Sequence, residues 1–256
     1  MKEMFKVARI IACLMLALGL FSLLISAYYN SNISAFIGLG LIFWGALLLY
    51  IAPTEYVSLK LLNAIAPSTL VNIEKILKYS DINSKGIYLP PKYLKNTESS
   101  LIFIPKESDK LLPSPEEIDE EKLYLENPKG LILTPPGLAL SKLFEREIGK
   151  SFLRTDLNYI ENNMPKLLIE NLEIAENIEI NTESSIITME ITNHILNEIC
   201  QETKKLERTH TAIGCPLCSA IACALAKATG KPIIILDEEI SEDGKIIKIK
   251  YQMLES

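Results

Sequence analysis

The chain has 256 residues, a formal net charge of −6 and an uneven distribution of charge. No Asp, Glu, Lys or Arg occurs between Ile10 and Pro53, and 31 of the 32 acidic residues follow that stretch. This distribution excludes an ordinary soluble protein, a disordered chain and a collagen-like chain. The acidic remainder offers no basic face that could neutralise phosphates, so nucleic acid is not expected as a partner.

Two apolar segments, at about residues 7–29 and 34–52, each approach the roughly 20 residues that an α-helix needs to cross a bilayer. In lipid, backbone polar groups must be hydrogen-bonded internally, so both segments are predicted to be transmembrane helices. The link between them is short and uncharged, which is typical of a tight antiparallel hairpin. A signal peptide is disfavoured because the first apolar run is long and a second span follows at once.

The bases near the hairpin indicate its orientation. Lys2, Lys6 and Arg9 precede the first span, and the link carries no base. By the positive-inside rule, we expect a multi-pass protein of the cell membrane with both termini in the cytoplasm. Neither span contains an ionisable residue, so the hairpin is predicted to be an anchor rather than an ion path.

Small residues recur along both spans, and such residues permit close approach of two helices. They are Ala8, Ala12, Gly19, Ser34, Gly38 and Gly45. Their spacing suits either packing within the hairpin or dimerisation, and packing within the hairpin is the simpler expectation.

Residues 54–130 are expected to connect the hairpin (residues 1–53) to a compact domain. The spacing of leucine and isoleucine predicts a juxtamembrane helix over residues 54–77, broken at Ala66-Pro67. The region is then predicted to hold two extended runs and one acidic, proline-punctuated loop: Gly86–Leu89, Leu101–Pro105 and Asp109–Asn127.

The compact domain is expected at residues 131–256. Its predicted elements are helices at 138–148 and 156–172, strands at 176–180 and 185–191, helices at 194–206 and 216–229, and strands at 233–236 and 246–254. Pro165 should kink or split the second helix, and Thr209–Ile213 is expected to be a connector. The order α-α-β-β-α-α-β-β predicts an α+β domain with an antiparallel sheet and packed helices.

This order, with the segments Leu172–Ile180, Cys215–Ala222 and Gly230–Ile235, resembles the 4-vinyl-reductase-like domains, relatives of the TRAPP vesicle-tethering subunits. The resemblance covers about residues 131–254. It implies a domain that holds a hydrophobic cavity, forms a homodimer and acts as a sensor or adaptor rather than an enzyme. Bacterial and archaeal members often carry paired cysteines between the last two strands, whereas residues 237–244 contain none, so no site there is carried over.

The sharpest local motif is Cys215-Pro216-Leu217-Cys218, at the predicted start of the 216–229 helix. Both thiols would lie at the positive end of the helix dipole, where unpaired N–H groups stabilise a thiolate. The chain also resembles archaeal membrane-anchored proteins of unknown function that share the segment Ile-Gly-Cys-Pro-Leu-Cys-Ser-Ala. That likeness implies no activity.

Three interpretations of this motif stay open. In the first, the small residues let a neighbouring element approach a buried helix closely. In the second, the helix start lines a cavity for an apolar small molecule or lipid; the candidate ligand-binding residues are Gly214, Cys215, Pro216, Cys218, Ser219 and Ala222. In the third, the two thiols exchange with a disulfide or bind a metal such as zinc or iron; the candidate metal ligands are Cys200, His210, Cys215 and Cys218.

No catalytic residue is assigned. The sequence has no Gly-x-Ser-x-Gly motif, and a connector role for His210 is favoured over a catalytic Cys–His pair. The chain is therefore predicted to be a membrane-anchored ligand-binding sensor or adaptor for an apolar small molecule or lipid. The alternatives are a thiol-redox or metal-binding protein centred on Cys215 and Cys218, and a structural membrane scaffold.

Overall fold

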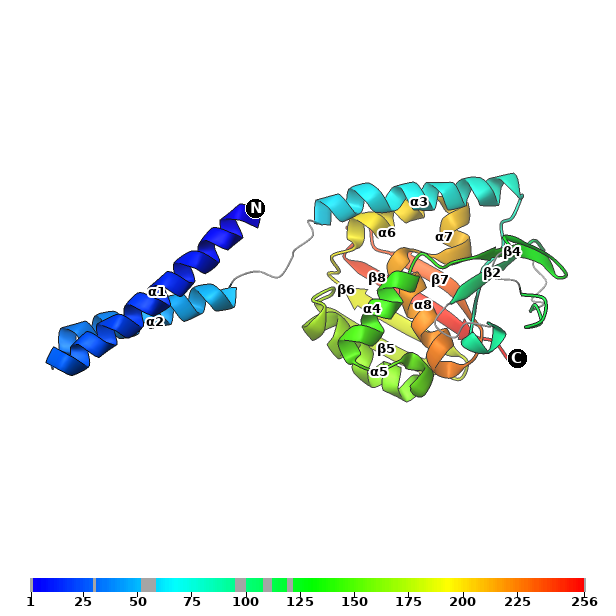
Figure 1. The fold of residues 1–256 in the computed structure, drawn as a ribbon. Helices are drawn as coiled ribbons and strands as arrows, with labels where there is room; N and C mark the ends of the chain where they lie inside the picture. Colours follow the sequence, from blue (N-terminus) through cyan, green and yellow to red (C-terminus); the bar gives the residue numbers. More distant parts are fainter. Residues whose placement is uncertain are drawn as a thin grey trace. The chain divides into compact units, whose positions relative to one another are not determined.

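The computed structural model describes residues 2–29, 31–51, 59–94, 100–107, 112–118 and 122–255. The chain divides into two compact units, Met1–Leu59 and Lys60–Ser256. The first contains two apolar helices, and the second combines an antiparallel sheet with helices (Figure 1). The predicted α+β class with two N-terminal apolar helices is confirmed.

The first unit is a hairpin of α1 (Lys2–Tyr29) and α2 (Asn32–Ile51). Its small residues lie where the two backbones meet, because a Cβ atom built on Gly19 would be 2.9 Å from the carbonyl oxygen of Gly38. A Cβ atom on Gly45 would be 3.1 Å from the carbonyl oxygen of Ala12. The expected packing within the hairpin is therefore confirmed.

Three helical stretches are long and apolar enough to cross a membrane: Ile10–Tyr29, Asn32–Tyr50 and Glu207–Thr229. The first two are the predicted spans, and only 11% of each is buried within the protein. The third is 83% buried by its own unit. It also consists of two helices separated at Gly214-Cys215, so it is part of a protein core rather than a lipid-facing span.

The second unit is built on an eight-stranded sheet in the order β3-β4-β2-β1-β7-β8-β6-β5, with all neighbouring strands antiparallel. The strands are β1 (Ile87–Leu89), β2 (Leu101–Pro105), β3 (Tyr124–Glu126), β4 (Lys129–Leu133), β5 (Asn177–Glu183), β6 (Ile186–Thr192), β7 (Ile233–Ile240) and β8 (Ile246–Met253). The predicted strands are present, but β5 continues through residues 181–183, between the two strands predicted at 176–180 and 185–191.

Residues of the expected connecting region belong to this same sheet. Strand β1 pairs with β7, where Tyr88 lies opposite Ile233, and β2 pairs with both β1 and β4. The sheet therefore extends upstream of residue 131, where we expected the compact domain to begin. Part of the predicted acidic loop, residues 109–111 and 119–121, lies outside the described residues, and β3 occupies its end.

The α-helices of the second unit are α3 (Leu59–Tyr79), α4 (Leu138–Ile148), α5 (Leu157–Lys166), α6 (Asn197–Lys204), α7 (Glu207–Ile213) and α8 (Pro216–Thr229). Short helical turns are η1 (Pro91–Tyr93), η2 (Phe152–Arg154) and the π-helix η3 (Leu167–Asn171). As expected, the predicted 156–172 helix is split just after Pro165, where α5 gives way to η3.

Two helical predictions were wrong. Helix α3 runs without a break through Pro67, and the expected connector at 209–213 is part of α7. A tertiary contact accounts for the second difference: the Glu74 carboxylate of α3 accepts hydrogen bonds of 2.8 Å from both the N–H and the hydroxyl of Thr209. These bonds satisfy an N–H of the first turn of α7, so the short helix is stabilised by α3 rather than by its own sequence.

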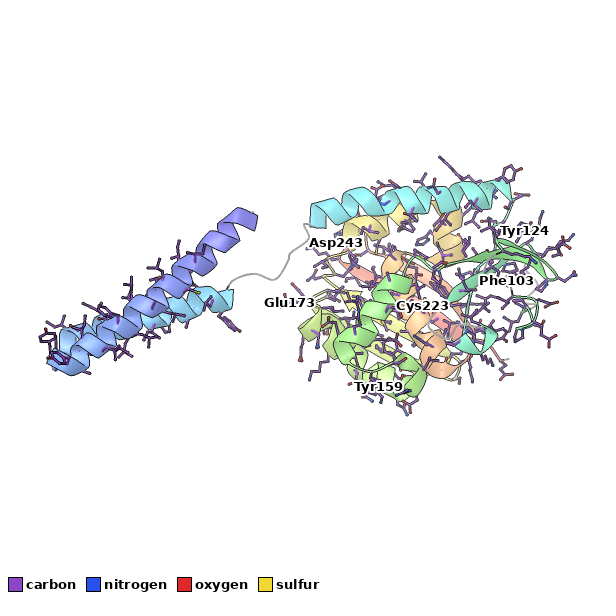
Figure 2. All side chains as sticks on the ribbon, viewed as in Figure 1. Phe103, Tyr124, Tyr159, Glu173, Cys223 and Asp243 are labelled. Carbon is purple, nitrogen blue, oxygen red and sulfur yellow. The ribbon has the colours of Figure 1, made fainter. Side chains whose placement is uncertain are left out.

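Helix α8 lies in the centre of the second unit, beside α4 (Figure 1). All of its residues from Leu217 to Lys227 are buried, and Figure 2 shows Cys223 on this helix among the side chains of its neighbours. The Gly137 N–H donates a 3.1 Å hydrogen bond to the Ser219 hydroxyl. The helix ends at Gly230 in the left-handed conformation, as predicted.

Candidate functional site

The Cys-x-x-Cys motif lies at the junction of α7 and α8. Gly214 ends α7 with a φ of +63°, which lets the chain turn directly into the next helix. Cys215 is the N-cap residue of α8, and its sulfur accepts the N–H of Cys218 at 3.5 Å. The predicted position of both thiols at the helix start is confirmed, and both side chains are fully buried.

A third thiol joins this pair from another helix. The sulfur of Cys215 lies 2.9 Å from that of Cys200 on α6 and 3.3 Å from that of Cys218. All three side chains are buried, and all three cysteines are free thiols. Of the residues predicted as metal ligands, the structure therefore brings the three cysteines together.

The fourth member of the group is Glu238 on β7. One of its carboxylate oxygens and the sulfurs of Cys215 and Cys218 all lie within 4.8 Å of one another. Its Oε2 accepts a 3.1 Å hydrogen bond from the N–H of Cys215. Its Oε1 has no hydrogen-bond partner among the described residues, although the side chain is only 2% exposed. We refer to Cys200, Cys215, Cys218 and Glu238 as the thiol–carboxylate cluster.

His210 takes a different position from the one that we expected. Its Nε2 lies 3.5 Å from Glu238 Oε1. However, His210 does not belong to the group formed by Cys215, Cys218 and Glu238, whose ligand atoms all lie within 4.8 Å of one another. His194 is also buried, and neither of its ring nitrogens has a hydrogen-bond partner within the described part of the chain. The described structure thus places Glu238, rather than a histidine, beside the two sulfurs of the motif.

Sequence reasoning missed Glu238 because the predicted strand at 233–236 ended before it. In the structure, β7 continues to Ile240, with a bulge between Ile235 and Asp237. Glu238 and Ile240 are both buried and two residues apart, so they lie on the same face of the strand. That spacing was the available signal.

Electrostatics distinguish the members of the cluster. Burial raises the pKa of Glu238 to about 7, and the neighbouring Cys215 adds to that rise. Burial also acts to raise the pKa of Cys215, but hydrogen bonds from Cys200 and Cys218 lower it well below the usual value overall. Hydrogen bonding to Cys215 raises the pKa of Cys200, and burial raises that of Cys218. These directions make Cys215 the most acidic thiol of the cluster.

An apolar pocket of about 310 Å³ lies beside the cluster, between α3, α4, α6 and the first turn of α8. Its walls include Leu70, Leu140, Ile199 and Leu217, and Cys200 belongs both to this wall and to the cluster. Of the residues predicted to bind a ligand, only Pro216 is among those that line this pocket. The predicted residues that do not line it are Gly214, Cys215, Cys218, Ser219 and Ala222.

Comparison with known proteins identifies a family. Residues 5–251 match the model of the family described as Domain of unknown function (DUF7982). Since the match covers nearly the whole chain, the protein belongs to this family, and both structural units are part of it. No curated protein and no solved structure matches the chain.

Proposed function

We propose that this member of the DUF7982 family is a membrane-anchored sensor or adaptor that binds an apolar small molecule or a lipid chain beside α8. The observation that carries the proposal is the apolar pocket at the start of that helix. Its volume of about 310 Å³ lies at the lower end of the range of roughly 300–1,000 Å³ that is usual for ligand pockets.

The chemistry of the pocket wall favours a hydrocarbon ligand. Its lining residues are Thr69, Leu70, Pro136, Ala139, Leu140, Leu196, Ile199, Cys200, Pro216 and Leu217, and none of them is charged. Transfer of apolar surface from water into such a wall contributes about 25 cal/mol per Å². The Thr69 hydroxyl and the Cys200 thiol are the two polar side chains in the lining, which suits one small polar group on an otherwise apolar molecule.

The hairpin supports the membrane part of the proposal. Its two helices are long and apolar enough to cross a bilayer, and the three bases that precede the apolar span of α1 favour an orientation with both termini in the cytoplasm. A domain tethered in this way would encounter molecules that partition into the bilayer. The resemblance to 4-vinyl-reductase-like domains also implies a hydrophobic cavity and a homodimer.

The test is photocrosslinking of the full-length protein in nanodiscs that contain a diazirine-labelled fatty acid. We expect crosslinked peptides from α4, α6 and the first turn of α8, in addition to those from the hairpin. The variant Ala139→Phe, which adds a large side chain at an exposed edge of the pocket, should abolish the crosslinks to α6 and α8. Ala139→Ser leaves the space open and is the matched control.

Crosslinks confined to α1 and α2 would contradict the proposal, because they would report only the lipid around the anchor. Equal labelling of α6 and α8 in Ala139→Phe and Ala139→Ser would also contradict it, because the label would then not be inside the pocket.

A further inference from the structure

The thiol–carboxylate cluster supports a second inference that does not depend on the pocket. Its four side chains come from three separate parts of the chain: α6, the start of α8, and β7. The folded chain therefore brings three sulfurs and a carboxylate together in its interior, and all four side chains are buried.

We propose that Cys215, Cys218 and Glu238 bind a divalent transition-metal ion of the zinc class, with Cys200 as the fourth ligand. Zinc lies about 2.3 Å from sulfur and about 2.0–2.2 Å from carboxylate oxygen, usually with tetrahedral geometry. Neighbouring ligand atoms in such a site are about 3.6–3.8 Å apart. The two motif sulfurs are 3.3 Å apart, and both lie within 4.8 Å of the carboxylate, so changes of up to about 1.2 Å bring these three ligand atoms to tetrahedral separations.

Cys200 supplies the fourth ligand in this proposal. Its sulfur lies 2.9 Å from that of Cys215, although it is outside the set of atoms that lie within 4.8 Å of one another. Rotation of this side chain toward Cys218 and Glu238 would open the contact with Cys215 and add a third sulfur ligand. Thiolate ligands select zinc, copper(I) and iron–sulfur chemistry over calcium and magnesium, which prefer oxygen.

The Glu238 carboxylate oxygen that accepts no hydrogen bond provides an independent reason for a cation. Glu238 Oε1 is deeply buried and has no hydrogen-bond partner among the described residues. Its one ion-pair partner in the described part of the chain is His210, at 3.5 Å. A buried carboxylate beside buried sulfurs is costly unless charge is compensated, and a divalent ion would supply that compensation.

The experiment uses full-length protein in detergent, reduced and kept under anaerobic conditions, with Co²⁺ as the spectroscopic probe and Zn²⁺ as the competitor. We expect one Co²⁺ per chain with thiolate-to-cobalt charge-transfer absorption, which Zn²⁺ abolishes. Cys215→Ser and Cys218→Ser should each weaken binding by at least about 100-fold, since removal of a supporting group alone typically costs 10–100-fold.

Two further variants test the remaining ligands. Glu238→Gln should weaken Co²⁺ binding by about 10–100-fold. Cys200→Ser should reduce the charge-transfer absorption to roughly two thirds, because two of three thiolates remain. Cys223→Ser is the matched control: this cysteine is on the same helix and equally buried, but it lies outside the cluster, so its Co²⁺ affinity and absorption should equal those of the parent protein.

Several outcomes would overturn the inference. The first is no saturable Co²⁺ uptake by the folded parent protein. The second is the same uptake in a Cys215→Ser/Cys218→Ser double variant, since the ion would then bind elsewhere. The third is a disulfide between Cys215 and Cys218 or Cys200 that forms reversibly while the reduced protein binds no metal, which would make the cluster a thiol-redox centre. Unchanged absorption in Cys200→Ser would remove that residue from the ligand set.

Discussion

The N-terminal hairpin and the α7–α8 stretch are both apolar, but protein covers them to very different extents. Both are apolar, both contain many small residues, and both are long enough to cross a bilayer. Only 11% of each hairpin span is buried within the protein, whereas 83% of the α7–α8 stretch is. Apolar composition and small residues therefore indicate that backbones approach closely, but they do not indicate whether lipid or protein covers the rest of the helix.

The two regions also differ in the charged and polar residues that they contain. Neither hairpin span contains a charged residue, as is typical of helices suited to lipid, where a charge would lack a partner. Helix α8 carries Lys227, which is buried and lies 2.9 Å from the Glu145 carboxylate of α4. It also carries Ser219, which accepts the N–H of Gly137. A paired charge in an apolar helix is thus what distinguishes the protein core from the membrane span.

The largest expected effect comes from breaking that ion pair. Lys227→Met should lower the free energy of unfolding by about 3 kcal/mol, because the largely buried Glu145 would lose its cationic partner and keep only hydrogen bonds from Ser151 and Phe152. Chemical denaturation of the full-length protein, followed by circular dichroism, measures the loss. The double variant Lys227→Met/Glu145→Leu removes both charges and should recover part of it. A single variant as stable as the parent protein would show that the pair does not stabilise the core.

A smaller effect is expected where α8 meets the backbone before α4. A Cβ atom on Gly137 would lie 2.6 Å from both the Cα of Ala220 and the carbonyl oxygen of Pro216. Gly137→Ala should therefore cost about 2–3 kcal/mol of unfolding free energy. Gly230→Ala is the control, because its cost of about 1 kcal/mol comes from a positive φ alone, with no atom within 4 Å. Equal losses in the two variants would contradict this account of close packing.

The elements that could be predicted from the sequence are those with local signals. The hairpin and the bounds of α8 follow from local signals: long apolar runs, Pro216 at a helix start and Gly230 at its end. The position of β1 beside β7 depends on pairing between residues almost 150 positions apart, for which a three-residue strand carries no local signal. Helix α7 likewise depends on Glu74 of α3.

In the candidate site, too, local features were predicted, whereas contacts between distant parts of the chain were not. Cys215 and Cys218 were predicted because their spacing and helix position are local. Their contact with Cys200 required α6 to pack against α8, although all three cysteines had been considered together as metal ligands. Glu238 was missed because its burial depends on a β-bulge that no residue type marks in the sequence.

The contact between α3 and α7 predicts a pH dependence of stability. Burial acts to raise the pKa of Glu74, but hydrogen bonds from Thr209 and the nearby Lys78 lower it overall. A carboxyl group whose pKa is lower in the folded state stabilises the protein above its unfolded pKa, and this contribution is lost as the pH falls through the folded pKa. Glu74→Gln should therefore cost about 1–2 kcal/mol at pH 7 and progressively less below about pH 4.5. Denaturation curves at several pH values measure this, and a cost that does not change with pH would contradict it.

The smallest expected effect concerns the hairpin, because helices in a bilayer pack without a hydrophobic driving force from water. A Cβ atom on Gly38 would lie 2.9 Å from the carbonyl oxygen of Gly19, whereas one on Gly40 would meet no atom within 4 Å. Gly38→Leu should weaken the contact between α1 and α2 by on the order of 1 kcal/mol, and Gly40→Leu should leave it unchanged. Disulfide crosslinking between engineered cysteines at Ser22 and Ser34, which lie together across the hairpin, measures the contact in nanodiscs in a background without the five native cysteines. Because the second unit has its own core, neither substitution should alter its denaturation midpoint. A lower midpoint in Gly38→Leu alone would show that the hairpin and the α+β unit are energetically coupled, and that the small residues of the spans stabilise more than the anchor itself.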